Sequence, residues 1–182
     1  EYRTVPVGFT EKYKIEFSGQ NLVPVLDDNG TIVHDSWEIA EYLEAKYPNA
    51  PELFPGAEGR LLANLTAEWI DSQHKKLLSF FILEIFNKLD FKDQPYFRLS
   101  REKRYGTTLE GVQSQREDRI IEFREVNLAP LRAHIIDRPF IAGAEPAYGD
   151  FAVFGTFQWA RLVSDFELLG PEDPIHDWRQ RM

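Results

Sequence analysis

Residues Asn21–Pro48 read NLVPVLDDNGTIVHDSWEIAEYLEAKYP, and this stretch decides the fold class. Two apolar runs flank the turn DDNG at Asp27–Gly30, a sequence that suits a tight hairpin. Asp35 follows the second run as a good helix N-cap, and Glu38 lies three residues later, where a capping box needs it. The stretch therefore predicts a β-hairpin that leads directly into a helix over Asp35–Tyr47.

Pro24 lies inside the first apolar run, where proline interrupts strand pairing because it has no N–H. A trans proline at a strand edge is the commoner arrangement. Such a proline leaves the backbone of the preceding residue, Val23, free to pair with an extended peptide by strand addition. On these residues alone, a plain edge strand and a peptide-pairing site both remain open.

Ser36 is harder to explain than Asp35, because a helix needs only one N-cap residue. A hydroxyl beside a free helix N-terminus suits a carboxylate ligand, since the first N–H groups have no intrahelical partner and the helix dipole is positive there. A neighbouring aspartate suits a ligand that also carries an ammonium group. Capping alone explains Asp35, so a polar pocket for an amino-acid-like end is a hypothesis that depends on Ser36.

The composition of the 182-residue chain excludes several classes of function. A net charge of −9 argues against nucleic acid and an anionic membrane surface as partners. The chain has no cysteine, which excludes disulfides, thiolate metal sites and a cysteine nucleophile. No apolar run has the length of a membrane span, so we expect no membrane partner and a cytoplasmic protein. We also expect no metal, because the histidines lack metal-ligand spacing: His34, His74, His134 and His176.

The hydrophobic pattern of the sequence changes from short β-type runs to helical periodicity at a proline-rich segment. Residues 1–50 contain short β-type runs separated by turn residues, and they predict a small α/β domain. The first run, Tyr2–Val7, predicts a strand, and the residues between it and Asn21 leave room for only a short helix. Residues 51–59 are typical of a linker, and residues 60–182 have mostly helical periodicity.

Three helices are predicted beyond the linker, over Arg60–Leu89, Val112–Ile135 and Pro146–Ser164. The third is apolar almost all round, which indicates a buried helix. The polar stretch 90–108 is expected to connect the first two helices, with the short basic cluster Arg101, Lys103 and Arg104 in a solvated turn. Several aromatic residues at helical spacing belong either to the core or to an aromatic substrate pocket: Phe80, Phe81, Phe86, Phe154, Phe157 and Trp159.

The stretch LVPVLDDNGTIVHDSWEIAEYLEAKYP resembles the latter half of the thioredoxin-like domain of a soluble glutathione transferase. In that family the Val-Pro bond is cis, and the residue before the proline holds the cysteinyl backbone of glutathione. The acidic residue and serine at the helix start bind its γ-glutamyl end. The resemblance thus implies glutathione as co-substrate, bound by Val23, Pro24, Asp35 and Ser36. It also implies the glutathione transferase fold, an α/β thioredoxin-like N-terminal domain followed by an all-α C-terminal domain.

Later motifs extend this resemblance over almost the whole chain. GDFAVFGTF matches the central buried helix of the family, with Asp150 as its capping aspartate, although the chain has Ala147 where the family usually has Ser, Thr or Asn. Three stretches resemble the FuA class of fungal glutathione transferases, which are related to bacterial glutathione-dependent β-aryl etherases: SREKRYGTTLE, PFIAGAEPAYGDFAVFGTFQWARLVSDFELL and DPIHDWRQRM.

The catalytic residue has no counterpart in this sequence. In the family, a first strand and helix precede the strand that we assign to Tyr2–Val7, and that helix begins with the hydroxyl that stabilises the thiolate. In the FuA class this residue is expected to be a serine. We therefore expect that the sequence is part of a longer protein, and the catalytic residue stays unknown.

The resemblance implies an enzyme that acts with glutathione on small hydrophobic aromatic electrophiles, with β-aryl ether cleavage or ligand binding as narrower readings. The alternative is a non-catalytic ligand-binding or interaction module with the same fold. The residue at the start of the upstream helix would discriminate. Serine or tyrosine supports transfer, cysteine supports thiol exchange, and an aliphatic residue supports the module.

A homodimer is the last expectation from the resemblance. It places the Thr31–His34 strand and the Asp35–Tyr47 helix against the Arg60–Leu89 and Val112–Ile135 helices of a second chain. Natural proteins also tend to cover a free strand edge. The first long helix carries more apolar residues than one internal contact requires, and the alternative is that these pack on the chain's own third helix: Leu77, Phe80, Phe81 and Ile85.

Overall fold

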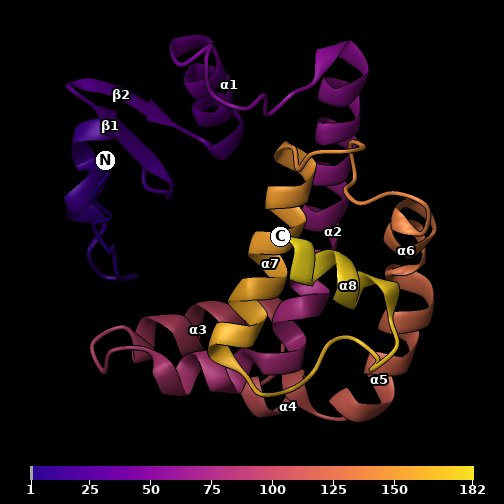
Figure 1. The fold of residues 1–182 in the computed structure, drawn as a ribbon. Helices are drawn as coiled ribbons and strands as arrows, with labels where there is room; N and C mark the ends of the chain where they lie inside the picture. Colours follow the sequence, from indigo (N-terminus) through magenta and orange to yellow (C-terminus); the bar gives the residue numbers. More distant parts are fainter. Residues whose placement is uncertain (1) are drawn as a thin grey trace.

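The computed structural model describes residues 2–182 (Figure 1). Its N-terminal part contains a short 3₁₀ helix, one hairpin and one α-helix. These elements are η1 (Lys12–Ser18), β1 (Val25–Asp28), β2 (Thr31–His34) and α1 (Ser36–Lys46). The predicted hairpin and helix are thus confirmed, and so is the short helix expected before Asn21.

The hairpin is antiparallel, with Val25 opposite His34. Its turn residues have φ angles of 53° at Asn29 and 90° at Gly30. Positive φ at both positions matches the twist of the two strands, which is why the DDNG sequence forms this turn. The hydroxyls of Tyr42 and Tyr47 donate to Asp28 at 2.9 and 3.0 Å, so the hairpin is tied to α1. These two bonds hold the pKa of Asp28 below its usual value.

The prediction of a strand over Tyr2–Val7 is wrong. Strands of the described residues 2–182 occur only in the hairpin, and Tyr2–Val7 has no neighbouring strand with which to form a ladder. The chain instead passes toward the helical part. Phe9 stacks on Tyr96 at 6.0 Å, and the Thr10 N–H donates to the Asp93 carboxylate at 2.7 Å.

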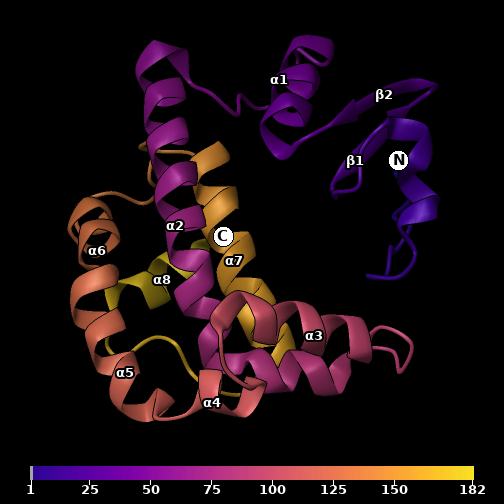
Figure 2. The same ribbon diagram turned by 180° about the vertical axis from the view of Figure 1, so that it is seen from behind.

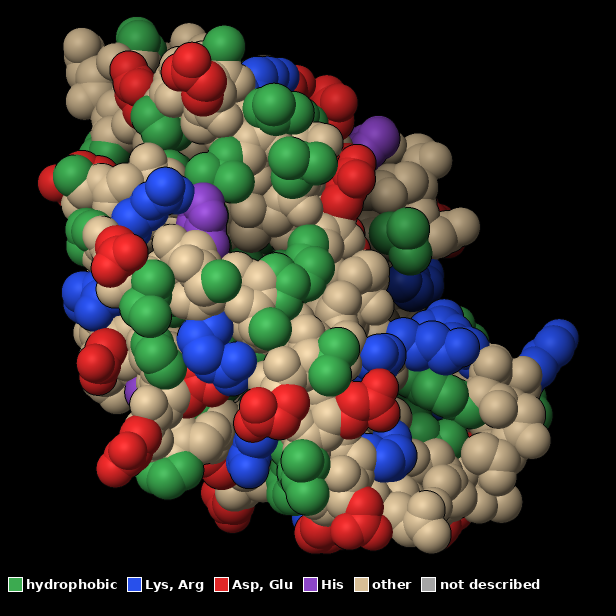
Figure 3. All heavy atoms as spheres, turned by 90° about the vertical axis from the view of Figure 1, so that its right-hand side faces the viewer, with side chains coloured by type: hydrophobic (Ala, Val, Ile, Leu, Met, Phe, Trp, Pro, Cys, Tyr) green, Lys and Arg blue, Asp and Glu red, His purple; other side chains and the backbone are tan. Residues whose placement is uncertain are grey.

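The rest of the chain is helical. α2 and α7 lie side by side through its centre in both ribbon views (Figures 1 and 2), and the other helices surround them. On the side that carries α5 and α6, acidic, basic and apolar side chains are interspersed (Figure 3). No helix of the described chain is both long and apolar enough to span a bilayer. The helices are α2 (Gly56–Lys88), α3 (Gln94–Tyr105), α4 (Leu109–Gln113), α5 (Arg116–Glu122), the π-helical η2 (Phe123–Asn127), α6 (Ala129–Ile135), α7 (Tyr148–Val163) and α8 (Pro174–Arg181).

The second predicted helix, Val112–Ile135, is broken into several pieces. Gln115 has a φ of 55°, which ends the helical path after α4. Further on, Pro130 has no N–H to donate, so the ladder of backbone bonds is interrupted there. The Leu128 N–H bonds to the Phe123 carbonyl five residues back, which is the π-helical pattern of η2.

The polar stretch 90–108 contains α3, which the sequence analysis missed. Its basic cluster lies on a helix and not in a turn, with Lys103 and Arg104 exposed and Arg101 partly buried. The Arg101 guanidinium lies over the rings of Phe97 and Phe9, at 4.8 and 5.1 Å from their centroids. A charged head over aromatic faces can pack at an apolar surface, so a strongly polar sequence here still forms a packed helix.

The surplus apolar residues of α2 pack inside the chain. Leu77, Phe80, Phe81 and Ile85 are all buried in the chain's own core. Phe81 contacts Trp159 of α7, while Phe80 contacts Phe123 of η2 and Phe166 just after α7. They therefore give no support to a dimer, and the alternative interpretation of these four residues is correct. Of the aromatic residues proposed for a pocket, Phe80, Phe81 and Phe157 are buried and the rest are partly buried against the same core.

Asp150 caps α7 as predicted and is completely buried. Its carboxylate accepts the N–H groups of Ile141 at 2.8 Å and Ala147 at 3.1 Å, and the indole N–H of Trp178 at 2.8 Å. Ala147 has no side-chain acceptor, so only the return half of the capping box forms. Asp150 nevertheless ties α7 to α8 and to the loop that precedes α7.

Candidate functional site

The hairpin register brings the four predicted ligand residues to one end of the sheet. Because Val25 faces His34, the residues before β1 and after β2 leave the ladder at the same end. Val23–Pro24 and Asp35–Ser36 therefore lie near each other, and all four residues are exposed. The Val23–Pro24 peptide is cis, as the resemblance predicts.

Asp35 is confirmed as the N-cap of α1. Its carboxylate accepts the N–H groups of Trp37 at 2.9 Å and Glu38 at 3.4 Å. Its backbone has φ 70° and ψ 133°, a combination that L-residues rarely adopt. Such a conformation costs about 1–3 kcal/mol and persists only where surrounding structure enforces it, often at functional sites. The N–H group of Ser36, the first helical residue, has no intrahelical partner and faces the exposed helix start.

An aromatic cluster orients the start of α1. The ring of Trp37 lies 4.8 Å from that of Phe54 and 5.2 Å from that of Tyr148, which is the first residue of α7. The Tyr148 N–H donates to the Leu53 carbonyl at 2.9 Å. Arg60 lies over the Trp37 and Phe54 rings. The helix that carries Ser36 is therefore held by the first turns of both α2 and α7.

Tyr148 also reaches the candidate site through its hydroxyl. Burial raises the pKa of this hydroxyl, the neighbouring Ser36 side chain lowers it, and the negative charges of Asp35 and Asp71 raise it. The Tyr148 hydroxyl thus lies beside Ser36 and close to two carboxylates. The sequence analysis missed Tyr148, although its position at the start of the predicted third helix was visible in PAYGDF.

His74 lies on the same side of α2 as Asp71, one turn further along. It stacks on Trp159 at 4.9 Å with an interplanar angle of 7°. Burial lowers the pKa of His74, with a smaller opposing effect from Asp71. The neutral imidazole is therefore favoured, and His74 lies at the surface, flat against Trp159 of α7.

The arrangement as a whole is an exposed helix N-terminus with a hydroxyl, a strained aspartate and a free stretch of backbone at the end of a hairpin. These groups can hold an extended peptide that carries a carboxylate and an ammonium group at one end. That is the kind of site found in proteins that bind small peptides by their backbone.

The sequence matches the glutathione S-transferase N-terminal domain over residues 1–51 and the glutathione S-transferase C-terminal domain over residues 62–169. The chain therefore belongs to the glutathione S-transferase family.

Solved structures with a similar fold include the glutathione transferase GSTFuA3 from Phanerochaete chrysosporium. The TM-score is 0.79 at 23% identity, over 99% of this chain and 76% of that one. A glutathione S-transferase of Ceriporiopsis subvermispora, solved in complex with glutathione, has a TM-score of 0.82 at 19% identity, over 100% of this chain and 82% of that one. At these identities the likeness concerns the fold.

Proposed function

We propose that the chain binds glutathione at the start of α1 and serves its transfer to small hydrophobic aromatic electrophiles. The observation that carries this proposal is Asp35, held at φ 70° next to Ser36 on an exposed helix start. A plain N-cap needs no such backbone conformation. An unfavourable backbone conformation is expected at Asp35 if it directs the carboxylate toward a ligand.

Each of the four residues has a separate role in this proposal. The Val23 backbone, kept outside the sheet by Pro24, pairs with the cysteinyl residue of glutathione. The Ser36 hydroxyl and N–H bind the γ-glutamyl carboxylate, where the helix dipole favours a negative charge. The Asp35 carboxylate binds the γ-glutamyl ammonium group. The glutathione complex of the Ceriporiopsis relative supports this choice of ligand.

Glutathione supplies the sulfur nucleophile of the reaction. A free thiol has a pKa of about 8.5, so a hydroxyl donor near the sulfur raises the thiolate fraction at neutral pH. A serine is proposed as this donor, and no residue of the present sequence takes that role. The residues that are present bind and orient. The thiolate attacks an electrophilic carbon and the leaving group departs; for a β-aryl ether, the carbon–oxygen bond breaks and a phenolate leaves. The FuA-class resemblance supports this narrower substrate.

The proposal also assigns the parts of the molecule. Residues 1–50 form the domain that holds glutathione, and residues 60–182 form the helical domain that receives the aromatic substrate. Residues 51–59 link the two domains. We further propose a cytoplasmic homodimer in which β2 and α1 pack on α2 and α5 of a second copy. Two exposed leucines on the first half of α2, Leu61 and Leu65, support α2 as the contact, in place of the buried residues considered first.

The test is calorimetric titration of glutathione into the Ser36→Ala variant. Loss of one hydrogen bond to a charged group costs about 1–2 kcal/mol, which is roughly 5- to 30-fold in affinity. Ser114→Ala is the matched control, because Ser114 is an exposed serine of the helical part whose hydroxyl donates to the Gly111 carbonyl at 2.8 Å. Unchanged affinity in Ser36→Ala contradicts the carboxylate role.

A turnover assay with a chlorodinitrobenzene separates the enzyme from the non-catalytic alternative. Conjugate formation above the uncatalysed rate, measured on a chain extended at its N-terminus by the family's first strand and helix, supports the transferase. Glutathione binding with no turnover in that extended chain supports the ligand-binding module.

A further inference from the structure

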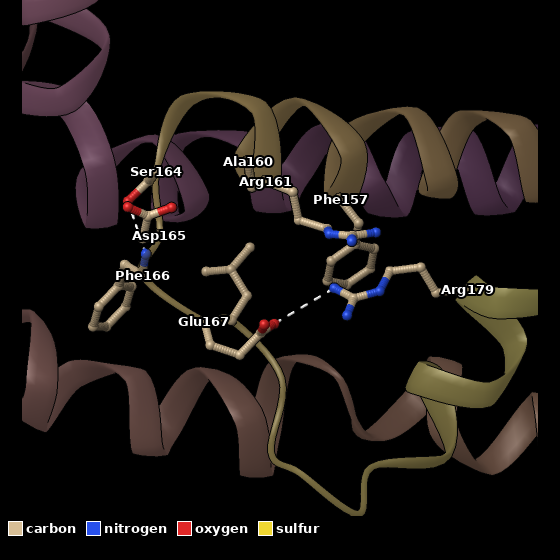
Figure 4. A pocket seen from close by; sticks show the side chains of 9 residues that line it. Phe157, Ala160, Arg161, Ser164, Asp165, Phe166, Glu167 and Arg179 are labelled. Carbon is tan, nitrogen blue, oxygen red and sulfur yellow. Dashed lines mark hydrogen bonds and ion pairs between the residues drawn. The ribbon is translucent and has the colours of Figure 1, made fainter.

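A cavity of about 280 Å³ lies at the C-terminal end of α7, far from the glutathione site (Figure 4). It is formed by the last turn of α7, by the segment 164–168 that follows, and by α8. α7 begins at Tyr148, and Arg161 follows thirteen residues later, so the helix separates the cavity from Ser36 by about 20 Å. Its lining includes Phe157, Arg161, Phe166, Glu167, Leu168 and Arg179.

Arg179 is a buried cation in the lining of this cavity, and its hydrogen bonding is incomplete. Its side chain is only 3% exposed, and its Nε is buried with no hydrogen-bond partner among the described residues. One terminal nitrogen contacts the Nδ1 of His176 at 3.0 Å, and the other lies 3.5 Å from the Glu167 carboxylate, at the limit of an ion pair. A buried guanidinium with an unpaired N–H is unfavourable unless a ligand or water completes it.

A second guanidinium faces the same cavity. The Arg161 side chain reaches back over α7, and one of its terminal nitrogens donates to the side-chain amide oxygen of Gln158 at 3.1 Å. Figure 4 shows the guanidinium groups of Arg161 and Arg179 projecting to the same part of the cavity, with the Phe157 ring between them. The two cations make this end of α7 favourable for an anion, and a planar guanidinium matches a carboxylate best. The Phe157 ring keeps one carboxylate from bridging both groups.

The rest of the lining restricts the anion. Phe166, which is partly exposed, offers an apolar contact to the body of a ligand, whereas Phe157 and Leu168 are buried in the core. The carboxylates of Asp165 and Glu167 also border the cavity, and they disfavour a ligand that carries more than one negative charge. The volume suits a ligand at the small end of the usual range. We propose that this cavity is a second ligand site, which binds a small monocarboxylate with an aromatic or branched apolar body. The carboxylate of the ligand pairs with Arg179, and Arg161 lies on the other side of the Phe157 ring.

Glu167 is the resident competitor of this ligand. Its side chain is 51% exposed, and its contact with Arg179 is long. A ligand carboxylate with better geometry displaces the Glu167 carboxylate from Arg179. The effect of a Glu167 substitution on ligand affinity therefore distinguishes this role from that of a purely structural ion pair. Removing the Glu167 charge strengthens ligand binding, whereas removing the Arg161 charge weakens it.

The experiment is a titration of the whole 182-residue chain with benzoate, in which calorimetry or NMR measures binding. We expect saturable binding with a dissociation constant at or below about 1 mM. Benzamide, which has the same shape without the charge, and inorganic phosphate should each bind at least about tenfold more weakly, because one lacks the anion and the other lacks the apolar body. Saturating glutathione should not alter the benzoate affinity, since the two sites are separate.

Three variants test the assignment without touching the buried Arg179. Arg161→Gln should weaken benzoate binding about tenfold, and Glu167→Gln should strengthen it about threefold. Arg181→Gln is the control of equal charge on α8, because the Arg181 Nε donates to the Pro139 carbonyl and lines no part of the cavity. The proposal is overturned if benzoate binding does not saturate up to about 10 mM, or if the two arginine variants weaken it equally. It is also overturned if benzamide or phosphate binds as tightly as benzoate, or if glutathione competes with benzoate.

Discussion

Replacement of Asp35 by glycine should make the protein more stable while weakening glutathione binding. The two effects have different origins, because the backbone of Asp35 is strained and its side chain faces the proposed ligand. The φ of 70° with ψ of 133° costs about 1–3 kcal/mol for an L-residue, and glycine removes this cost. Glycine in place of an N-cap aspartate loses a few tenths of a kcal/mol, and its freer unfolded chain costs about 0.4–1 kcal/mol.

The balance is a gain of about 1 kcal/mol, which raises Tm by about 2–4 °C in a chain of this length. Asp35→Ala gives the opposite sign, because alanine keeps the strain and loses about 1 kcal/mol of capping. Glycine should therefore exceed alanine by about 2 kcal/mol in the free energy of unfolding, the reverse of their usual order inside helices.

Glutathione affinity should fall in both variants. Loss of a hydrogen bond between charged groups costs about 1.5–3 kcal/mol, or roughly 10- to 150-fold. Asp35→Asn is the matched control for the charge, since asparagine caps as well as aspartate and tolerates positive φ. It should leave Tm nearly unchanged and still weaken binding. Thermal unfolding and calorimetric titration measure the two quantities. An alanine variant as stable as the glycine variant, or glycine with full glutathione affinity, would refute this reasoning.

Three further predictions follow from other contacts. Tyr148→Phe keeps the aromatic cluster and removes the hydroxyl next to the serine of α1, so glutathione affinity should fall about 2- to 10-fold with Tm nearly unchanged; calorimetry and thermal unfolding check this. Leu65→Glu places a charge on the exposed side of α2, so sedimentation should show the mass of a single chain where the wild type shows a dimer, and a dimeric variant would place the contact elsewhere. Bonds from Lys14, and then from Lys92, lower the pKa of Glu11 from 4.5 to about 2, so its stabilising effect is complete above pH 4.5 and is lost as the pH falls toward 2. An NMR titration of the Glu11 carboxyl with its midpoint near 4.5 would contradict these ion pairs.

The parts of the fold that were predicted from the sequence are those that local chemistry determines. The turn residues Asn29 and Gly30 need positive φ, and few residues other than these supply it. Asp35 and Asp150 are acidic residues just before or within a first helical turn, where they accept backbone N–H groups. The placement of Val23–Pro24 beside Ser36 then follows from the hairpin register alone.

The parts that could not be predicted depend on contacts between distant residues. The strand expected at Tyr2–Val7 has suitable side chains, but a strand also needs a neighbour. The helix α3 has a strongly polar sequence and is recognisable only when Arg101 is seen over Phe97 and Phe9. The apolar residues of α2 could face either a second chain or α7, and periodicity does not discriminate between these.

The candidate site also combines residues that local sequence determines with a residue that tertiary packing brings in. Asp35 and Ser36 are local, while Tyr148 reaches Ser36 only through the packing of α7. The buried Asp150 carboxylate holds the loop and the backbone immediately before Tyr148, and it also bonds to Trp178 in α8. The position of a hydroxyl at the site therefore depends on a buried network outside it. A substitution at Asp150 or Trp178 should alter glutathione binding without any contact to the ligand, since it moves the first turn of the helix against which α1 is packed.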